Sequence, residues 1–392
     1  MLKKMVLKLL LKTWKKGGFS VVFWDGEQED YGNEPPAFKV IFHKEPPVKF
    51  NNDDMVLALG EAYMDGILDF EGSMDDIIRI MALNTQPQPL PQPDRSAAAS
   101  DCRVQQQNIQ HHYDIGNDFF SLWLDETMSY SCAYFKSPAD SLYQAQLQKI
   151  DHVLRKLNLK PGERLLDIGS GWGWLIIRAA QQYQVQATGI TLSEEQYAGT
   201  KRRIQALGLE DQVQVKLMSY LELEPGQFQF DKIVSVGMFE HVGKSNLPCY
   251  MNKVNELLVP GGLSLLHTIT GMFEEITNSW MTKYIFPGGY VPSLRETVWL
   301  LPEYDFHLIH LESLRMHYAM TLDRWYENFV NHTDSIRKKF DERFVRMWTL
   351  YLNGCAAAFR ASGLDIYQLL FTKGLNNELP LTYDYLYREN CV

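Results

Sequence analysis

The middle of the chain alternates β-prone and helix-prone segments, and few folds accommodate such a pattern. The strand-like runs are 163–169, 185–190, 212–218, 230–237 and 262–270. Helix-like runs stand between them, at 173–183, 193–208 and near 250–258. This alternation predicts parallel βαβ units wound into an open sheet that helices cover on both faces. Two later strand-like runs, 307–316 and 364–373, enclose a long helical insert and predict a late antiparallel strand.

The first part of the chain has a different pattern and predicts a separate small domain. Two β-prone runs, 19–26 and 37–43, precede two helical stretches, 53–64 and 74–83. In the following segment, 84–100, four prolines at alternate positions are succeeded by small and polar residues, as in an extended linker. We therefore predict an α+β domain at 1–83, a Pro-rich linker at 84–100 and a larger α/β domain at 101–392.

Residues 1–16 concentrate positive charge. They contain six lysines and no acid, so they carry +6, and the other 376 residues carry 32 minus 48, or −16, within a net charge of −10. Lys4, Lys8, Lys12 and Lys16 recur every fourth residue and predict a basic amphipathic helix. The segment is too polar to be a membrane span or a secretory signal. Two interpretations stay open: a solvated surface helix, and an interfacial helix in which each lysine contributes about 1 kcal/mol on anionic lipid.

Composition excludes several classes of protein. The acidic balance makes nucleic acid a poor partner. Five cysteines, an odd number without any CxxC pair, indicate a reducing cytoplasmic compartment and neither a disulfide framework nor a structural zinc site. The adjacent His111 and His112 do not predict a metal site, because neighbouring side chains point apart and no further ligand pattern accompanies them.

A glycine-rich turn follows the first strand of the predicted sheet. LDIGSGWG (166–173) places Asp167, Gly169, Gly171 and Gly173 in a D-x-G-x-G-x-G run. Glycines let the backbone turn sharply and let a ligand approach without an intervening Cβ. Open sheets bind ligands beyond the carboxyl ends of their strands, where this turn lies. A turn without a ligand is one alternative, and a dinucleotide fingerprint is another, although the latter has G-x-G-x-x-G spacing.

The spacing is typical of class I methyltransferases that bind S-adenosylmethionine, and the surrounding motifs allow a narrower match. The chain resembles the cyclopropane-fatty-acyl-phospholipid synthase family and the related mycolic acid cyclopropane synthases. Besides LDIGSGWG, the segments that carry the resemblance are HHYDIGNDFF (111–120), MSYSCAYF (128–135), GITLSEEQ (189–196), VGMFEHVG (236–243), LLHTIT (265–270) and MHYAMTLDRW (316–325). The resemblance implies a Rossmann-like, mostly parallel sheet with a smaller N-terminal α+β domain.

The resemblance also implies S-adenosylmethionine as cofactor. Tyr130 and Ser131 would close over its methionine end, and Thr191 and Gln196 would hold its ribose. The implied cofactor-binding set is Tyr130, Ser131, Asp167, Gly169, Gly171, Trp172, Gly173, Thr191, Leu192, Gln196 and Tyr220. The chain departs from the family at Ser170, where many members have Cys, and at Ser219, where many have an acid near the adenine.

Bicarbonate is the base that the resemblance implies. It would be held by Cys132 and Ile269 through backbone groups and by Glu240, His267 and Tyr318 through side chains. Taken singly, these residues are equally typical of core positions; their joint occurrence in the motifs carries the prediction. Cys355 matches a family position sometimes given as an active-site cysteine, although its helical, Ala-rich surroundings also suit a small buried hydrophobe.

The resemblance therefore implies transfer of a methylene unit to cis double bonds of unsaturated phospholipid acyl chains, through a carbocation that bicarbonate deprotonates. It implies a cytoplasmic homodimer, peripherally associated with the inner face of the membrane through the basic helix. Two alternatives on the same scaffold stay open, a methyl-branched product and small-molecule N-methylation. A catalytically idle lipid-binding protein is the alternative from another class.

Overall fold

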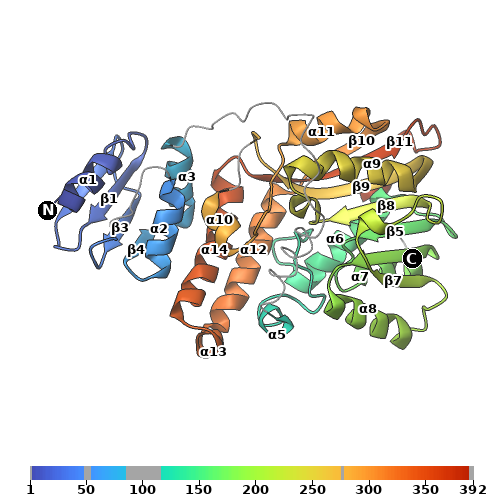
Figure 1. Cartoon of the computed structure of the whole chain (residues 1–392), viewed down its shortest axis with the longest axis horizontal. Helices are drawn as coiled ribbons and strands as arrows, with labels where there is room; N and C mark the ends of the chain where they lie inside the picture. The colour runs from blue at the N-terminus through green and yellow to red at the C-terminus, as the bar shows by residue number, and fades with distance from the viewer. Residues whose placement is uncertain (1, 48–53, 85–115, 275–277, 388–392) are drawn as a thin grey trace. The chain divides into compact units, whose positions relative to one another are not determined.

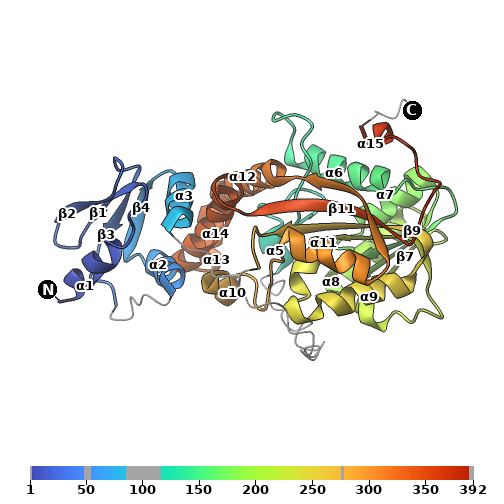
Figure 2. The same ribbon diagram turned by 90° about the horizontal axis from the view of Figure 1, so that it is seen from above.

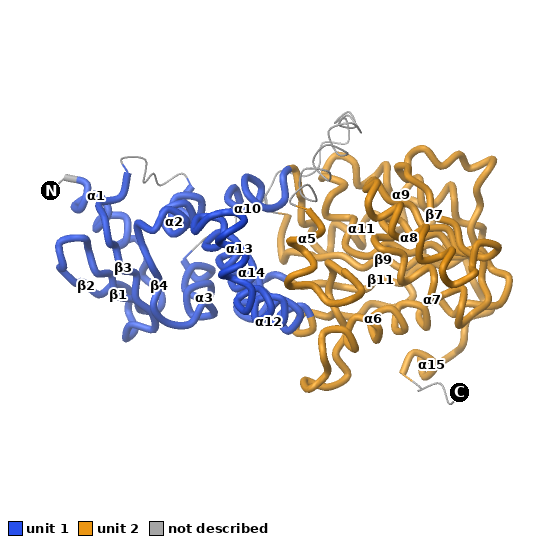
Figure 3. The backbone as a smooth tube through the Cα atoms, turned by 90° about the horizontal axis from the view of Figure 1, so that it is seen from below, with its two compact units in different colours: residues 1–90, 275–287, 318–364 blue, residues 91–274, 288–317, 365–392 orange. Residues whose placement is uncertain are grey.

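The computed structural model describes residues 2–47, 54–84, 116–274 and 278–387 (Figure 1). These residues form two compact units, each with its own sheet (Figure 3). Unit 1 comprises 1–90, 275–287 and 318–364, and unit 2 comprises 91–274, 288–317 and 365–392. The predicted linker lies almost wholly outside the described residues, as do His111 and His112.

Unit 1 contains a four-stranded sheet of order β2-β1-β3-β4. Its strands are β1 (Gly18–Val22), β2 (Gln28–Gly32), β3 (Phe38–Phe42) and β4 (Leu68–Gly72). β1 pairs antiparallel with β2 and parallel with β3, and β4 pairs antiparallel with β3. The strand predictions at 19–26 and 37–43 are confirmed as β1 and β3. β2 and β4 were not predicted, because their acidic and glycine-bearing sequences lack the β-prone pattern.

The helices of unit 1 come from distant parts of the chain. They are α1 (Leu2–Leu11), α2 (Met55–Met64), α3 (Met74–Asn84), α10 (Ser279–Tyr284), α12 (Arg315–Asn331, from residue 318), α13 (Thr333–Lys339) and α14 (Glu342–Ala361). Arg346 on α14 donates to the carbonyls of Tyr63 and Leu68, and Arg360 pairs with both Asp75 and Asp323.

Packing therefore divides the chain differently from the predicted boundary at 84–100. The helical insert of the larger predicted domain packs with residues 1–83. The arginine contacts that hold it span 277 to 285 residues of sequence, so no local pattern could indicate them.

The lysine face of α1 is turned toward acids of its own unit. Lys4 pairs with Asp25 and Glu27, each at 2.5 Å, and Lys8 pairs with Glu27 at 2.6 Å. Leu7 and Leu11 are buried in the sheet core. The predicted lysine face is thus largely neutralised by these carboxylates, a pairing that neither sequence interpretation included.

The outer face of α1 is apolar. Met5, Val6 and Leu9 expose 54%, 45% and 61% of their surfaces. Exposed large apolar side chains grouped on one short helix indicate a surface suited to contact with another molecule. Among the described residues, no helix is long and apolar enough to span a membrane.

Unit 2 contains a seven-stranded sheet of order β10-β11-β9-β8-β5-β6-β7. Its strands are β5 (Arg164–Ile168), β6 (Gln186–Thr191), β7 (Val213–Leu217), β8 (Phe230–Val236), β9 (Leu258–Thr270), β10 (Phe306–Ser313) and β11 (Asp365–Lys373). β7, β6, β5, β8 and β9 run parallel, whereas β11 is antiparallel to both β9 and β10. The predicted α/β class, with its late antiparallel strand, is confirmed.

Helices cover both faces of this sheet (Figure 2). The helices of unit 2 are α5 (Asn117–Phe120), α6 (Leu142–Lys156), α7 (Trp174–Tyr183), α8 (Glu194–Ala206), α9 (Leu247–Leu257), α11 (Leu294–Glu303) and α15 (Asp384–Tyr387). Side chains of α6 and α7 form one buried apolar cluster with the sheet, and side chains of α9 and α11 form another. The parallel strands β5, β6 and β8 have their carboxyl ends at one cavity.

Candidate active site

A cavity of about 630 Å³ lies in unit 2 at the carboxyl ends of β5, β6 and β8. Its walls come from the loop 127–131, α6, the glycine-rich turn and the segments 190–196, 217–222 and 236–242. This is the position where open parallel sheets bind their ligands. Ten of the eleven predicted cofactor-binding residues line it: Tyr130, Ser131, Asp167, Gly169, Gly171, Trp172, Thr191, Leu192, Gln196 and Tyr220.

The glycine-rich turn needs glycine at three positions for two different reasons. Gly169, Gly171 and Gly173 have φ of +85°, +53° and +78°, which side chains disfavour. A Cβ on Gly171 would meet nothing within 4 Å, so its backbone is open to a ligand. A Cβ on Gly173 would lie 2.3 Å from a carbon of Thr200. Gly173 is the predicted residue that does not line the cavity: it begins α7 and lets α8 approach.

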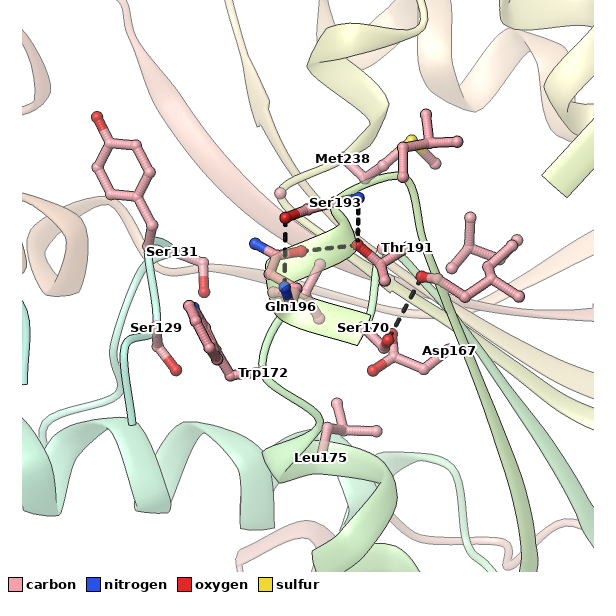
Figure 4. A pocket seen from close by; sticks show the side chains of 18 of the residues that line it. Ser129, Ser131, Asp167, Ser170, Trp172, Leu175, Thr191, Ser193, Gln196 and Met238 are labelled. Atoms are coloured by element: carbon pink, nitrogen blue, oxygen red, sulfur yellow. Dashed lines mark hydrogen bonds between the residues drawn. The ribbon is translucent and has the colours of Figure 1, made fainter. Parts of the chain in front are cut away.

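Thr191 and Gln196 meet at the cavity wall (Figure 4). The Thr191 hydroxyl donates to Gln196 Oε1 at 2.7 Å. Ser193 caps α8 by accepting the Gln196 N–H at 3.3 Å. The end of β6 and the first turn of α8 thus hold the two side chains predicted to contact the ribose in a fixed arrangement.

A short helical turn, η2 (Tyr220–Glu222), forms the opposite wall. Ser219 and Glu222 cap it reciprocally: the Ser219 hydroxyl accepts the Leu221 N–H, and the Glu222 carboxylate accepts the Ser219 N–H at 2.6 Å. Tyr220 packs edge-on against Tyr250. Glu222 lines the same cavity three residues after position 219, with its carboxylate bonded to the Ser219 N–H.

The loop bearing Tyr130 and Ser131 is held by α6. Gln146 donates to the Ser131 carbonyl at 2.9 Å, and Lys149 Nζ donates to the Ser131 hydroxyl at 3.0 Å. Tyr130 packs against the rings of Phe120 and Trp123. Sequence reasoning missed Lys149, although a lysine on the apolar face of an amphipathic helix was a signal that could have found it.

Asp167, the penultimate residue of β5, is buried and lines the cavity. Burial raises the pKa of its carboxyl to about 7, although the positive charge of Lys149 opposes the shift. Together the Cβ-free turn, the aromatic walls and two buried groups of opposite charge fit a ligand such as S-adenosylmethionine, which joins a nucleoside to a zwitterionic amino acid.

A second group of predicted residues surrounds the end of β9. Glu240 lies in a helical turn, η3 (Phe239–His241), and its Oε1 accepts the Ile269 N–H at 2.6 Å. Its buried Oε2 has no hydrogen-bond partner among the described residues. Burial raises the pKa of Glu240, and the Ile269 N–H opposes this. The Ile269 N–H is thus occupied by Glu240, which removes it from the backbone contacts predicted for a bound ion.

His267 is fully buried on β9. Its Nδ1 lies 3.1 Å from Gln368 Nε2, which comes from the paired position on β11. Burial holds the pKa of His267 well below its usual value, so the imidazole is neutral. His267 Nε2 has no hydrogen-bond partner among the described residues, and neither has Oε1 of Gln368.

The remaining predicted catalytic residues lie in different surroundings. Cys132 is buried in unit 2, with its Sγ 3.2 Å from the Ala133 carbonyl. Tyr318 and Cys355 belong to unit 1, where Tyr318 packs against Trp325 and Phe359. Burial raises the pKa of the Cys355 thiol to about 12, so it is protonated at neutral pH and is a poor nucleophile.

Comparison with known families separates the chain into two segments. Residues 100–369 match the family model described as mycolic acid cyclopropane synthetase. Residues 6–88 match a family described as a domain of unknown function. The gap between the two matches falls within the Pro-rich segment.

Individual relatives cover most of the chain. A Pseudomonas putida protein named "Probable fatty acid methyltransferase" is 39% identical over 93% of this chain and 95% of its own length. The cyclopropane-fatty-acyl-phospholipid synthase of Escherichia coli K12 is 40% identical over 82% of this chain and 85% of its own. Among solved structures, the mycolic acid cyclopropane synthase CmaA1 complexed with SAH and CTAB is 34% identical, with a TM-score of 0.64 over 68% of this chain and 98% of that one.

Proposed function

The chain belongs to the mycolic acid cyclopropane synthetase family, and on that premise we propose that it converts cis double bonds of unsaturated phospholipid acyl chains into cyclopropane rings. The methylene unit comes from S-adenosylmethionine. The observation that carries the proposal is the pair of unsatisfied buried atoms, Glu240 Oε2 and His267 Nε2. Buried polar atoms in folded proteins are usually bonded, so a bound group that reaches these two atoms would satisfy both.

The reaction sets clear demands on the site. When bound, S-adenosylmethionine supplies an electrophilic methyl group. An isolated double bond is a weak nucleophile with no acidic hydrogen, so a base is needed only after the new carbon–carbon bond leaves positive charge on the acyl chain. The chain must therefore exclude water, tolerate positive charge and keep a base in place. Burial makes His267 a weak base, and one oxygen of Glu240 is occupied by the Ile269 N–H.

We propose that bicarbonate occupies the position between these groups and supplies the basic oxygen. A bare anion beside Glu240 would be repelled, but bicarbonate carries both acceptors and one hydroxyl hydrogen. It can donate its hydroxyl hydrogen to Glu240 Oε2 and form a second hydrogen bond with His267 Nε2, the two unsatisfied atoms. Participation of Cys132 through its backbone and of Tyr318 through its hydroxyl stays a prediction from the family resemblance.

Access to a phospholipid acyl chain requires contact with a membrane surface, and we propose that α1 makes it. The attraction of its lysines to anionic lipid is weaker than the sequence suggests, since Lys4 and Lys8 are paired with carboxylates. The exposed Met5, Val6 and Leu9 are better suited, because burying each apolar side chain in lipid contributes about 1 to 3 kcal/mol. A cytoplasmic homodimer docked at the inner face of the membrane completes this proposal.

The product of the reaction tests the assignment. The chain is incubated with vesicles of a cis-monounsaturated phosphatidylglycerol and labelled S-adenosylmethionine in carbonate-free buffer, with and without added bicarbonate. We expect acyl chains heavier by one CH2 that have lost their olefinic protons, and turnover that rises when bicarbonate is restored. Olefinic protons that persist would contradict any modification of the double bond, and turnover indifferent to bicarbonate would contradict the base.

A methyl-branched product is the second candidate, and the name of the Pseudomonas putida relative, which covers 93% of this chain, favours it. The two products differ in the fate of the carbocation. Loss of a proton from the new methyl group closes a ring, whereas a saturated methyl branch requires a hydride from a separate reductant. Magnetic resonance of the product lipid separates them, since only a cyclopropane ring gives strongly shielded ring protons.

A further inference from the structure

A buried lysine of the cofactor cavity has no carboxylate in direct contact, although Asp125 and Asp167 attract its charge from farther away. Lys149 lies on α6 and exposes only 4% of its surface, yet it lines the cavity. Among the described residues, its Nζ donates one hydrogen bond, to the Ser131 hydroxyl at 3.0 Å. No carboxylate oxygen of the described residues lies within 4.0 Å of this ammonium. An ammonium has three hydrogens to donate, so two remain for another partner.

The other buried lysines show how unusual this is. Among the described residues, Lys156 and Lys232 are also buried, and each has a carboxylate, from Glu312 at 2.5 Å and from Glu163 at 3.5 Å. A buried charge without such a partner costs several kcal/mol. Burial accordingly lowers the pKa of Lys149. The position therefore suits an anion that arrives with a ligand.

A purely structural role for Lys149 explains fewer of these observations. Lys149 could serve only to hold the loop at Ser131, but Gln146, one turn earlier on α6, already holds the Ser131 carbonyl at 2.9 Å. A neutral donor could bond the Ser131 hydroxyl at lower desolvation cost. The charge itself needs another explanation.

The opposite charge stands on the same cavity. Asp167, which Figure 4 shows at the end of β5 beside Ser170, is buried and lines the cavity with Lys149. One buried ammonium and one buried carboxyl are the complement of an α-amino acid, which carries a carboxylate and an ammonium on one carbon. S-adenosylmethionine ends in such a group.

We propose that Lys149, with the Ser131 hydroxyl, binds the α-carboxylate of the methionine part of the cofactor, while Asp167 faces its α-ammonium. Lys149 is thereby a cofactor-binding residue that selects ligands with an intact amino-acid end over nucleosides that lack it. The inference rests on the proposed use of S-adenosylmethionine, and the wild-type measurements below test that use separately.

The experiment compares three ligands by titration calorimetry on the full chain. S-adenosylhomocysteine has the carboxylate, decarboxylated S-adenosylmethionine lacks only the carboxylate, and 5′-methylthioadenosine lacks the whole amino-acid part. For Lys149→Met, we expect affinity for S-adenosylhomocysteine to fall by about 30-fold or more, as for loss of a charged hydrogen bond. Affinities for the other two ligands should change by less than about threefold. Lys201→Met, the same change at an exposed lysine on α8, should leave all three affinities as in the wild type.

Several outcomes would overturn the inference. An equal loss for all three ligands would mean that Lys149 only maintains the shape of the cavity, and an unchanged affinity for S-adenosylhomocysteine would remove the contact. If Lys149→Met fails to fold, the wild type alone decides. Its affinity for S-adenosylhomocysteine must exceed that for 5′-methylthioadenosine by about 30-fold or more. Its affinity for decarboxylated S-adenosylmethionine must also be lower than the changed balance of charge beside Asp167 would explain without a contact to Lys149. A wild type that binds none of the three would instead contradict the proposed cofactor.

Discussion

Removal of the Glu312 carboxylate is expected to destabilise unit 2 and to loosen the loop that approaches the cofactor. Glu312 on β10 accepts from Lys156 at 2.5 Å and from His152 at 2.6 Å, both on α6. The ring of Tyr134 stacks on His152 at 4.3 Å and on His317 at 4.7 Å. This network therefore anchors the segment 128–135, which also carries Tyr130 to Cys132.

Two estimates of the same ion pair give the magnitude, and burial, which lowers the pKa of Lys156, offsets part of it. Lys156 is fully buried, and leaving a buried charge without its partner costs about 3 to 5 kcal/mol. The partners of Glu312 also lower its pKa from 4.5 to about 2, and roughly 2.5 pH units at about 1.36 kcal/mol each give about 3 kcal/mol. We expect Glu312→Gln to lower the free energy of unfolding by about 3 kcal/mol at pH 7.

The pH dependence has a definite sign. Because the pKa of Glu312 is lower in the folded chain than in the unfolded one, its stabilisation is complete above pH 4.5 and is lost as the pH falls toward 2. The difference between wild type and Glu312→Gln should therefore narrow below about pH 4.5. His152, whose pKa is lowered by burial, adds a loss of stability in both proteins as the pH falls below its usual value.

Urea denaturation followed by circular dichroism measures these differences. Glu303→Gln, at an exposed acid on α11, is the matched control and should change stability by less than about 0.5 kcal/mol. The double variant Lys156→Met, Glu312→Leu should recover most of the loss, because it leaves no unpaired buried charge. The reasoning would be refuted if the double variant lost as much unfolding free energy as the two single changes together. It would also be refuted if Glu312→Gln lowered that free energy no more than the control does.

Three further changes probe the other parts of the chain. Glu240→Gln should reduce turnover by about 10²- to 10⁴-fold, while affinity for S-adenosylhomocysteine in calorimetry stays within about twofold; normal turnover would remove the anion cluster. Gly173→Ala should lower the unfolding free energy by about 2 kcal/mol or more in urea titrations, because its Cβ would clash with Thr200 at positive φ; wild-type stability would contradict that constraint. In vesicle sedimentation, Leu9→Glu should weaken binding about tenfold or more, whereas Lys12→Gln should have little effect; the reverse order would restore the lysine mechanism.

The sequence by itself determined the features that depend on neighbouring residues. Alternation of strands and helices gave the parallel sheet, since each segment buries its own apolar face. The run from Asp167 to Gly173 marked the ligand cavity, because strand ends and sharp turns have local signatures. Family motifs indicated residues as distant as Tyr130 and Tyr220 as cofactor-binding, and in the structure both line one cavity.

Only the tertiary structure decided which groups meet across long separations. A lysine-rich helix predicts a charged face, but whether that face meets water, lipid or a carboxylate depends on where Glu27 folds back. Likewise, the apolar face of α6 indicates that Lys149 is buried, but only the assembled walls of the cavity show which groups contact its ammonium. The reason is physical: charge, burial and pairing are properties of a three-dimensional neighbourhood, and a local window of sequence contains only one side of each contact.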